Sequence, residues 1–316
     1  MLNIFTLENG RLAKIQPDEI AARKPIWVDV IASDDEEREW VNKTFSIILP
    51  QAEHLRYIEA SARFYEENDE LHVRSDFLLG KESESRSVIV AFVLSNNVLF
   101  SVHDEDLPVF HRFRLRSRVQ PDLVSDSRDV LIDLYGSDVE FSADALEEAY
   151  ADLGNISGTV LGHALSDKEA AAVLASISHA EHLNGRVRRN LMDTRRAVSF
   201  LMRSQLLTPG QMEESRQIMQ DIDSLDGHTA FLFDKINFLM ASTVGFININ
   251  QNKIVRLFSV ASVALLPPTL IASIYGMNFK HMPELEWASG YPIALLMMVT
   301  SITLPFWLFH RKGWLK

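Results

Sequence analysis

A short stretch near the C-terminus, "SIYGMNFKHMPELEW" (residues 273–287), carries polar groups between two apolar runs. It places one neutral amide, Asn278, directly after the first run, and two carboxylates, Glu284 and Glu286, a few residues later. An amide carbonyl accepts hydrogen bonds from the water shell of a small divalent cation without stripping that shell. Carboxylates outside it raise the local concentration of cations. The stretch therefore predicts a place where hydrated cations are captured and released.

The two flanking runs, residues 257–275 and 291–309, are uncharged. Each is close to the ~20 residues that a helix needs to cross a bilayer. Aromatic residues, which favour the membrane interface, stand near their edges: Tyr275, Phe279, Trp287, Tyr291, Trp307 and Trp314. We expect two transmembrane helices in contact with a lipid bilayer; the alternative is a pair of core helices buried in a large soluble domain.

Charge predicts the orientation of these spans. Lys253 and Arg256 precede the first span and a basic segment, residues 310–316, follows the second, whereas the connecting loop has Lys280 against two glutamates. The positive-inside rule places both termini in the cytoplasm and the loop outside. The first 20 residues hold no apolar core of signal-peptide length, so we expect a multi-pass protein of the inner (plasma) membrane with a cytoplasmic body.

Composition restricts the chemistry. The 316-residue chain has a net charge of −12 and no cysteine, which excludes disulfides and thiolate metal sites. An acidic body argues against nucleic acid as a partner and fits a protein that handles cations. Neither a nucleophile–base pattern nor a phosphate-binding loop is present, so we do not expect an enzyme. His179 and His182 are three residues apart but lack a third ligand, and we interpret them as surface residues.

The pattern of elements predicts three parts. Residues 1–125 mix strand and helix signals, with a strand at 26–31, a capping box from Ser33 to Glu36 and a hairpin at 88–102, which is typical of an α/β domain. Residues 126–252 have helical periodicity with a break at 206–210. No proline occurs between Gly210 and Pro267, so one helix of about 84 Å is expected to run into the two-helix membrane part, residues 253–316.

The loop resembles a known signature. Tyr275-Gly276-Met277-Asn278 followed by Met282-Pro283-Glu284-Leu285 is similar to the hallmark of the CorA magnesium channel family. The segments at 58–73, 191–201 and 245–254 resemble its enterobacterial type, so the likeness covers the whole chain. The Met-Pro-Glu-Leu loop favours the magnesium branch over the zinc-transporting branch.

This resemblance implies an α+β membrane protein that forms a homopentameric funnel, with long stalk helices leading into the pore. It implies a selectivity filter at Gly276, Met277 and Asn278. It also implies pore-lining positions at Asn252, Val255, Phe258, Leu266 and Thr269, with cation capture by Glu284 and Glu286. The spacing of these pore positions keeps one helical face towards an axis; the alternative interpretation of that face is ordinary helix packing.

Regulation is also implied by the resemblance. Family members sense cytoplasmic Mg²⁺ through carboxylates between subunits, and Asp221, Asp223 and Glu53 are the candidates here. Related sequences carry an acidic pair where this chain has Arg56-Tyr57, which is a departure from the family pattern. A solvated helix face is the alternative for these carboxylates.

The sequence thus predicts channel-like Mg²⁺ influx driven by membrane potential, with Mg²⁺ both transported and regulatory, and with Co²⁺ and Ni²⁺ also carried. Two alternatives remain: a transporter of the same family that prefers Co, Ni or Zn, and a membrane-anchored scaffold. The loop argues against the scaffold, because an anchor has no use for Asn278.

Overall fold

The computed structural model describes the chain except for residues 51–62, 81–85, 163–164, 279–281, 288 and 314–316. The side chains of Glu284 and Leu285 are also left out. The chain forms two compact units. The first comprises Met1–His163 and Ala172–Met240, and the second comprises Ala164–Ala171 and Ala241–Lys316.

A mixed seven-stranded sheet forms the base of the first unit, in the order β2-β1-β3-β7-β6-β5-β4. Among the strands that the structure describes, β3 and β7 pair in parallel and the other neighbours are antiparallel. The predicted strand at 26–31 and the predicted hairpin at 88–102 are confirmed. The strands are β1 (Leu2–Glu8), β2 (Arg11–Ile15), β3 (Trp27–Ile31), β4 (Phe64–Glu67), β5 (Glu70–Leu79), β6 (Arg86–Ser95) and β7 (Val98–His103).

Both faces of the sheet are covered, as the alternation along β3 requires. Val28 and Val30 belong to a core cluster with Val41 of α1 (Asp35–Phe45). Trp27 points to the other face, where its ring stacks on Phe5 at 4.7 Å. Helices α3 (Pro108–Val119) and α4 (Ser127–Gly162) contact strands of the sheet.

The start of α1 corrects one prediction. The cap is Asp34, whose carboxylate accepts the backbone N–H of Glu37 at 2.8 Å, and not Ser33. The Ser33 hydroxyl instead accepts a hydrogen bond from Arg38 Nε at 3.0 Å. The capping position therefore lies one residue later than expected.

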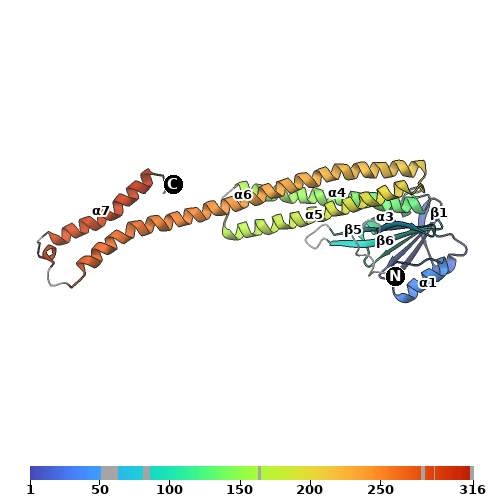
Figure 1. The fold of residues 1–316 in the computed structure, drawn as a ribbon, viewed down its shortest axis with the longest axis horizontal. Helices are drawn as coiled ribbons and strands as arrows, with labels where there is room; N and C mark the ends of the chain where they lie inside the picture. Colours follow the sequence, from blue (N-terminus) through green and yellow to red (C-terminus); the bar gives the residue numbers. More distant parts are fainter. Residues whose placement is uncertain (51–62, 81–85, 163–164, 279–281, 288, 314–316) are drawn as a thin grey trace. The chain divides into compact units, whose positions relative to one another are not determined.

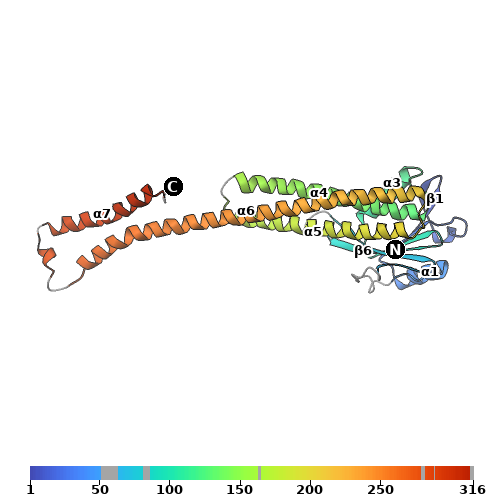
Figure 2. The ribbon, with the colours of Figure 1, turned by 45° about the horizontal axis from the view of Figure 1, so that its top comes forward.

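Three long helices complete the first unit. Figures 1 and 2 both show that α4 lies alongside α5 (Asp167–Arg203) and the N-terminal part of α6 (Pro209–Tyr275). The break between α5 and α6 falls at the predicted Pro-Gly segment. Buried Asp138 of α4 accepts hydrogen bonds from Asn190 at 2.8 Å and Thr194 at 3.1 Å, which fixes α4 against α5. The short helix η1 (Pro17–Glu19) also belongs to this unit.

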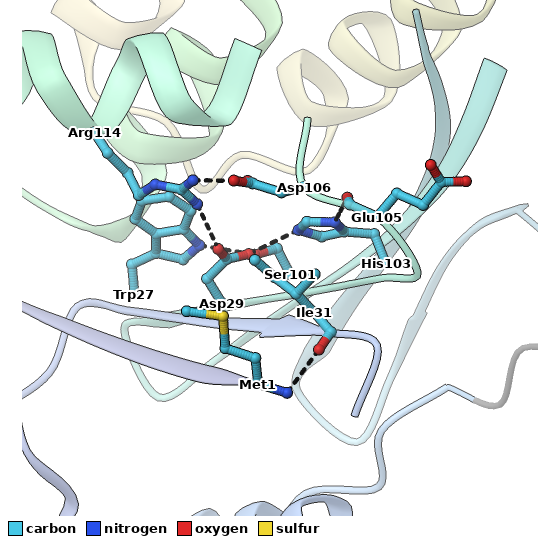
Figure 3. A network of polar contacts seen from close by, with 9 residues as sticks. All are labelled: Met1, Trp27, Asp29, Ile31, Ser101, His103, Glu105, Asp106 and Arg114. Carbon is cyan, nitrogen blue, oxygen red and sulfur yellow. Dashed lines mark hydrogen bonds and ion pairs between the residues drawn. The ribbon is translucent and has the colours of Figure 1, made fainter. Parts of the chain in front are cut away.

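A buried carboxylate joins the sheet to α3 (Figure 3). Asp29 is fully buried, and one of its oxygens accepts from Ser101 Oγ at 2.7 Å and from His103 Nε2 at 2.9 Å. The other oxygen accepts from Arg114 at 2.9 Å, and Arg114 also binds Asp106 at 2.7 Å. A buried charge is stable only when it is paired and hydrogen-bonded, and this network meets that condition.

His103 is held between two acceptors. Its Nδ1 lies 2.5 Å from the carbonyl oxygen of Glu105, and its Nε2 faces the Asp29 carboxylate. Both acceptors require an N–H, so the ring is the doubly protonated imidazolium. Burial lowers the pKa of His103, but the hydrogen bond and the charge of Asp29 outweigh burial, so the pKa is raised.

This arrangement predicts a pH-dependent stability. Because the pKa of His103 is raised by folding, its contribution is present below the ordinary histidine value and is lost as pH rises through the folded pKa. Thermal unfolding from pH 5.5 to 8.5 is the measurement. His103→Gln should lower stability by about 1–3 kcal/mol at the acidic end and flatten the pH dependence. The exposed His111→Gln is the control, and an equal loss at both ends of the range would contradict the account.

Candidate functional site

Two helices have the length and apolar composition of membrane spans: α6, whose C-terminal part lies in the second unit and ends at Tyr275, and α7 (Gly290–Arg311). Only 11% and 6% of their apolar windows are buried. Core helices of a soluble domain would be mostly buried, so that alternative does not describe this chain. Their exposed apolar surface is suited to lipid or to neighbouring helices.

The predicted filter residues follow the end of α6. The backbone N–H of Gly276 donates to Ala272 O at 2.9 Å, and that of Met277 donates to Ile274 O at 3.2 Å, so two of the last four carbonyls of the helix have donors. A Cβ on Gly276 would lie 3.1 Å from Ala272 O, which explains a glycine here. Asn278 comes next, with its side chain exposed.

The loop continues into a short helix, η3 (Pro283–Glu286), before α7 begins. Glu286 and Trp287 are exposed. Glu284 lies in η3 by its backbone, but its side chain is outside the described part of the chain. Proline at the first position of η3 and the hydrogen bond from Gly290 N to Trp287 O at 3.0 Å shape the turn into α7.

The predicted pore positions lie on one exposed face of α6. Val255, Phe258 and Leu266 are 63%, 71% and 67% exposed, which is unusual for large apolar side chains in a folded chain. Asn252 and Thr269 are exposed on the same face. This stripe of five residues, called the α6 stripe below, is left uncovered by its own chain.

The opposite side of α6 is covered. Val260 and Ala264 are 3% and 1% exposed, and they lie four residues apart on one face. On the α6 stripe, the Thr269 hydroxyl donates its hydrogen to Leu265 O at 2.7 Å, so the Thr269 oxygen faces outward as a hydrogen-bond acceptor. The span therefore has one buried face and one face with mixed amide, apolar and hydroxyl character.

Of the regulatory candidates, Asp221 and Asp223 have different surroundings in the described part of the chain. Asp221 lines a pocket of about 380 Å³, whereas Asp223 is ion-paired with Arg195 of α5. Two residues two apart on a helix point in nearly opposite directions, which explains the separation. Glu53 lies outside the described residues. Among the residues that the structure describes, no group of three His, Asp or Glu side chains is placed to hold a metal ion.

The pocket beside Asp221 contains carboxylates that sequence reasoning missed. Asp133 and Glu140 of α4 and Glu214 of α6 line it together with Arg116 of α3. Burial raises the pKa of Asp133 to about 6, against the opposing charge of Arg116, and burial also raises the pKa of Glu214. These residues come from three helices far apart in sequence, so no local signal marks them.

Residues 23–311 match the model of a protein family described as "CorA-like Mg2+ transporter protein". The chain is 41% identical over 318 residues to the magnesium transport protein CorA of Escherichia coli strain K12, with 100% of each chain covered. It is 42% identical over the same length, again with full coverage, to the protein of that name from Sodalis glossinidius.

Solved structures share the fold. The complete CorA magnesium transporter of Methanocaldococcus jannaschii superposes with a TM-score of 0.81 at 20% identity, covering 99% of this chain and 98% of that one. The full-length CmaX protein gives a TM-score of 0.69 at 13% identity, with 98% and 97% covered. The ZntB cytoplasmic domain of Vibrio parahaemolyticus gives 0.55 at 12% identity, with 78% and 97% covered.

The pocket generates a prediction on stability. A carboxyl whose pKa rises from 3.8 to about 6 on folding stabilises the fold only while protonated, so stability falls as pH rises between these values. Asp133→Asn imitates the protonated form and should raise stability at pH 8 by about 1–3 kcal/mol. Hydrogen exchange of the α4 amides is the measurement, with the exposed Asp152→Asn as control. A lower protection in Asp133→Asn at pH 8 would contradict it.

Proposed function

The chain belongs to the family of CorA-like Mg²⁺ transporters, and from this premise we propose that it carries Mg²⁺ into the cell through a channel-like pore. The family match over residues 23–311 and the full-length identity to magnesium transport proteins carry the proposal. The proposed division of labour is a cytoplasmic α/β domain (1–125), a helical stalk (126–252) and a membrane pore (253–316).

The proposed mouth is Asn278, with Gly276 and Met277 forming the backbone beside it. Mg²⁺ dehydrates reluctantly, so a site that is to pass it quickly has to bind the water shell rather than the bare ion. A neutral amide accepts hydrogen bonds from that shell and releases it again, because no full charge traps the ion. The exposed position of Asn278 directly after α6 supports this role.

One amide per chain is a weak site, so we propose a symmetric homopentamer in which several copies of Asn278 form a ring. The α6 stripe supports this assembly, since Val255, Phe258 and Leu266 expose apolar surface that copies of α6 would enclose around an axis. Hydrophobic narrowing of that kind gates a pore by dewetting. Glu284 and Glu286 would concentrate cations outside the mouth.

Membrane potential supplies the proposed driving force. Two charges moving through 100 mV gain roughly 4.6 kcal/mol, from about 2.3 per charge. The chain would lie in the inner membrane with both termini in the cytoplasm, as the basic residues at 253, 256 and 311–312 favour. No nucleotide site is then needed to power uptake.

The pore would also carry Co²⁺ and Ni²⁺. In their water shells these ions are similar in size to hydrated Mg²⁺, so a mouth that binds the water shell would pass them too. Cytoplasmic Mg²⁺ would hold the closed state through carboxylates, with Asp221 as the residue to test, because it lies beside other crowded carboxylates. Asp223 and Glu53 are further candidates for this regulatory Mg²⁺ site.

The direct experiment measures Mg²⁺ uptake into liposomes that contain the purified protein, under an inside-negative potential. Asn278→Ala should lower uptake by at least about tenfold. Each lost hydrogen bond to the water shell is worth about 0.5–1.5 kcal/mol, and about 1.4 kcal/mol is tenfold. Asn155→Ala, the same change on an exposed face of α4, is the control. Normal uptake by assembled Asn278→Ala would overturn the mouth, and a folded wild type without uptake would favour the scaffold alternative.

A second change probes the backbone beside the mouth. Gly276→Ala places a Cβ 3.1 Å from Ala272 O, so the end of α6 has to shift by a few tenths of an ångström. Uptake should fall, but less than in Asn278→Ala, because the amide is kept and only displaced. The same liposome assay measures it. Uptake equal to that of the wild type would show that the mouth tolerates this displacement.

A further inference from the structure

The connection between α4 and α5 makes a specific contact with α6 shortly before the span. The side chain of Asn250 donates a hydrogen bond from Nδ2 to the backbone oxygen of Leu165 at 2.9 Å, across 85 residues of sequence. Leu165 is 5% exposed, and the hydrogen bond to its carbonyl is partly buried. Removing a partner from such a bond leaves the carbonyl to find another donor, which costs free energy.

The accepting side of this contact is built to be rigid. Ser166 and Glu169 form a capping box at the start of α5: the Glu169 carboxylate accepts from Ser166 N at 2.8 Å, and the Ser166 hydroxyl accepts from Glu169 N at 3.3 Å. Leu165 directly precedes this cap. The carbonyl that Asn250 binds is therefore fixed to the end of a 37-residue helix.

A second observation places this tip with the membrane part. The compact unit that contains the spans takes residues Ala164–Ala171 from the start of α5, whereas the remainder of α5 belongs to the other unit. On α6, Thr243 is buried and Asn250, two turns later, is half-buried, so this face is covered. Gln251, the next residue, is exposed.

We propose that Asn250 is a positioning residue that fastens the α4–α5 connection to α6 and thereby fixes the rotation of α6 about its own axis. Asn252 and Val255 follow within five residues on the same rigid helix, so the rotation at Asn250 sets the direction in which the α6 stripe points. In this proposal, the orientation of α6 that the bond holds is the one in which the apolar side chains narrow the path. This inference rests on the proposed Mg²⁺ transport and adds a control point to it.

Uptake kinetics of full-length protein in liposomes test the proposal. In Asn250→Ala the maximal rate of Mg²⁺ uptake should rise about threefold, the effect of losing one hydrogen bond. The external Mg²⁺ concentration for half-maximal uptake should not change, because the mouth residues are untouched. Asn250→Asp has the same size and shape, but its carboxylate has no hydrogen to donate, so it should behave like Asn250→Ala. Gln251→Ala is the matched control and should transport like the wild type.

Hydrogen exchange gives the structural readout on the same proteins. Amides of residues 165–171 should exchange faster in Asn250→Ala and Asn250→Asp than in Gln251→Ala. Faster exchange with an unchanged maximal rate would reduce Asn250 to a structural contact and overturn the proposal, as would unchanged exchange. A wild type that takes up no Mg²⁺ would instead refute the proposed function. Failure of the Asn250 proposal is thus distinguished from failure of the proposed transport.

Discussion

Inside a bilayer every backbone N–H and C=O has to find its hydrogen-bond partner within the protein, because hydrocarbon offers none. The helix α6 meets most of this demand by remaining helical from Pro209 to Tyr275. Pro267 and Pro268 lack N–H groups, so two carbonyls one turn earlier lose their usual donors. The helix nevertheless continues to Tyr275, where Gly276 and Met277 close its last turn. The position of Asn278 follows from where this helix is able to end.

The distribution of charge along the same helix bears on the proposed path of the ion. Its first part lies in an acidic unit in which burial raises the pKa of Asp133 and Asp138. No acidic residue occurs from Lys235 to Pro283, so the span itself carries no fixed negative charge that would trap a divalent ion. Cations would then be attracted at the two ends and would pass quickly between them, as conduction requires.

Much of this architecture is readable from sequence because it follows from local rules. Residues 26–31 and 88–102 are rich in residue types that favour strands, and the second segment has a turn between its two strands. The Pro-Gly pair at 209–210 marks where α6 begins. The cap of α1 was misplaced by one residue because Ser33 and Asp34 are both good caps, and only the contact of Ser33 with Arg38 separates them.

Long-range polar contacts were not predictable. Asp29 meets His103 and Arg114 only because β3 and β7 pair in parallel and α3 returns across the sheet. Asn250 meets Leu165 across a helical hairpin, and nothing in the segment around Asn250 distinguishes it from Asn248 or Asn252. The different directions of Asp221 and Asp223 follow from helical geometry. The residues near each of them could not be predicted, because these residues depend on where α4 and α5 pack against α6.

We propose that the α6 stripe lines the path of the ion, and thiol labelling can test this position. The chain has no cysteine, so a thiol reagent reacts only with a cysteine that is introduced. Ser262 lies on the same helical face as Val255 and Leu266, whereas Ala261 is rotated by about 100° from it. Mg²⁺ uptake would be measured before and after a cationic thiol reagent is applied to Ser262→Cys and Ala261→Cys. The account predicts that the reagent blocks uptake through Ser262→Cys and spares Ala261→Cys. Equal effects on the two variants, or none on either, would contradict it.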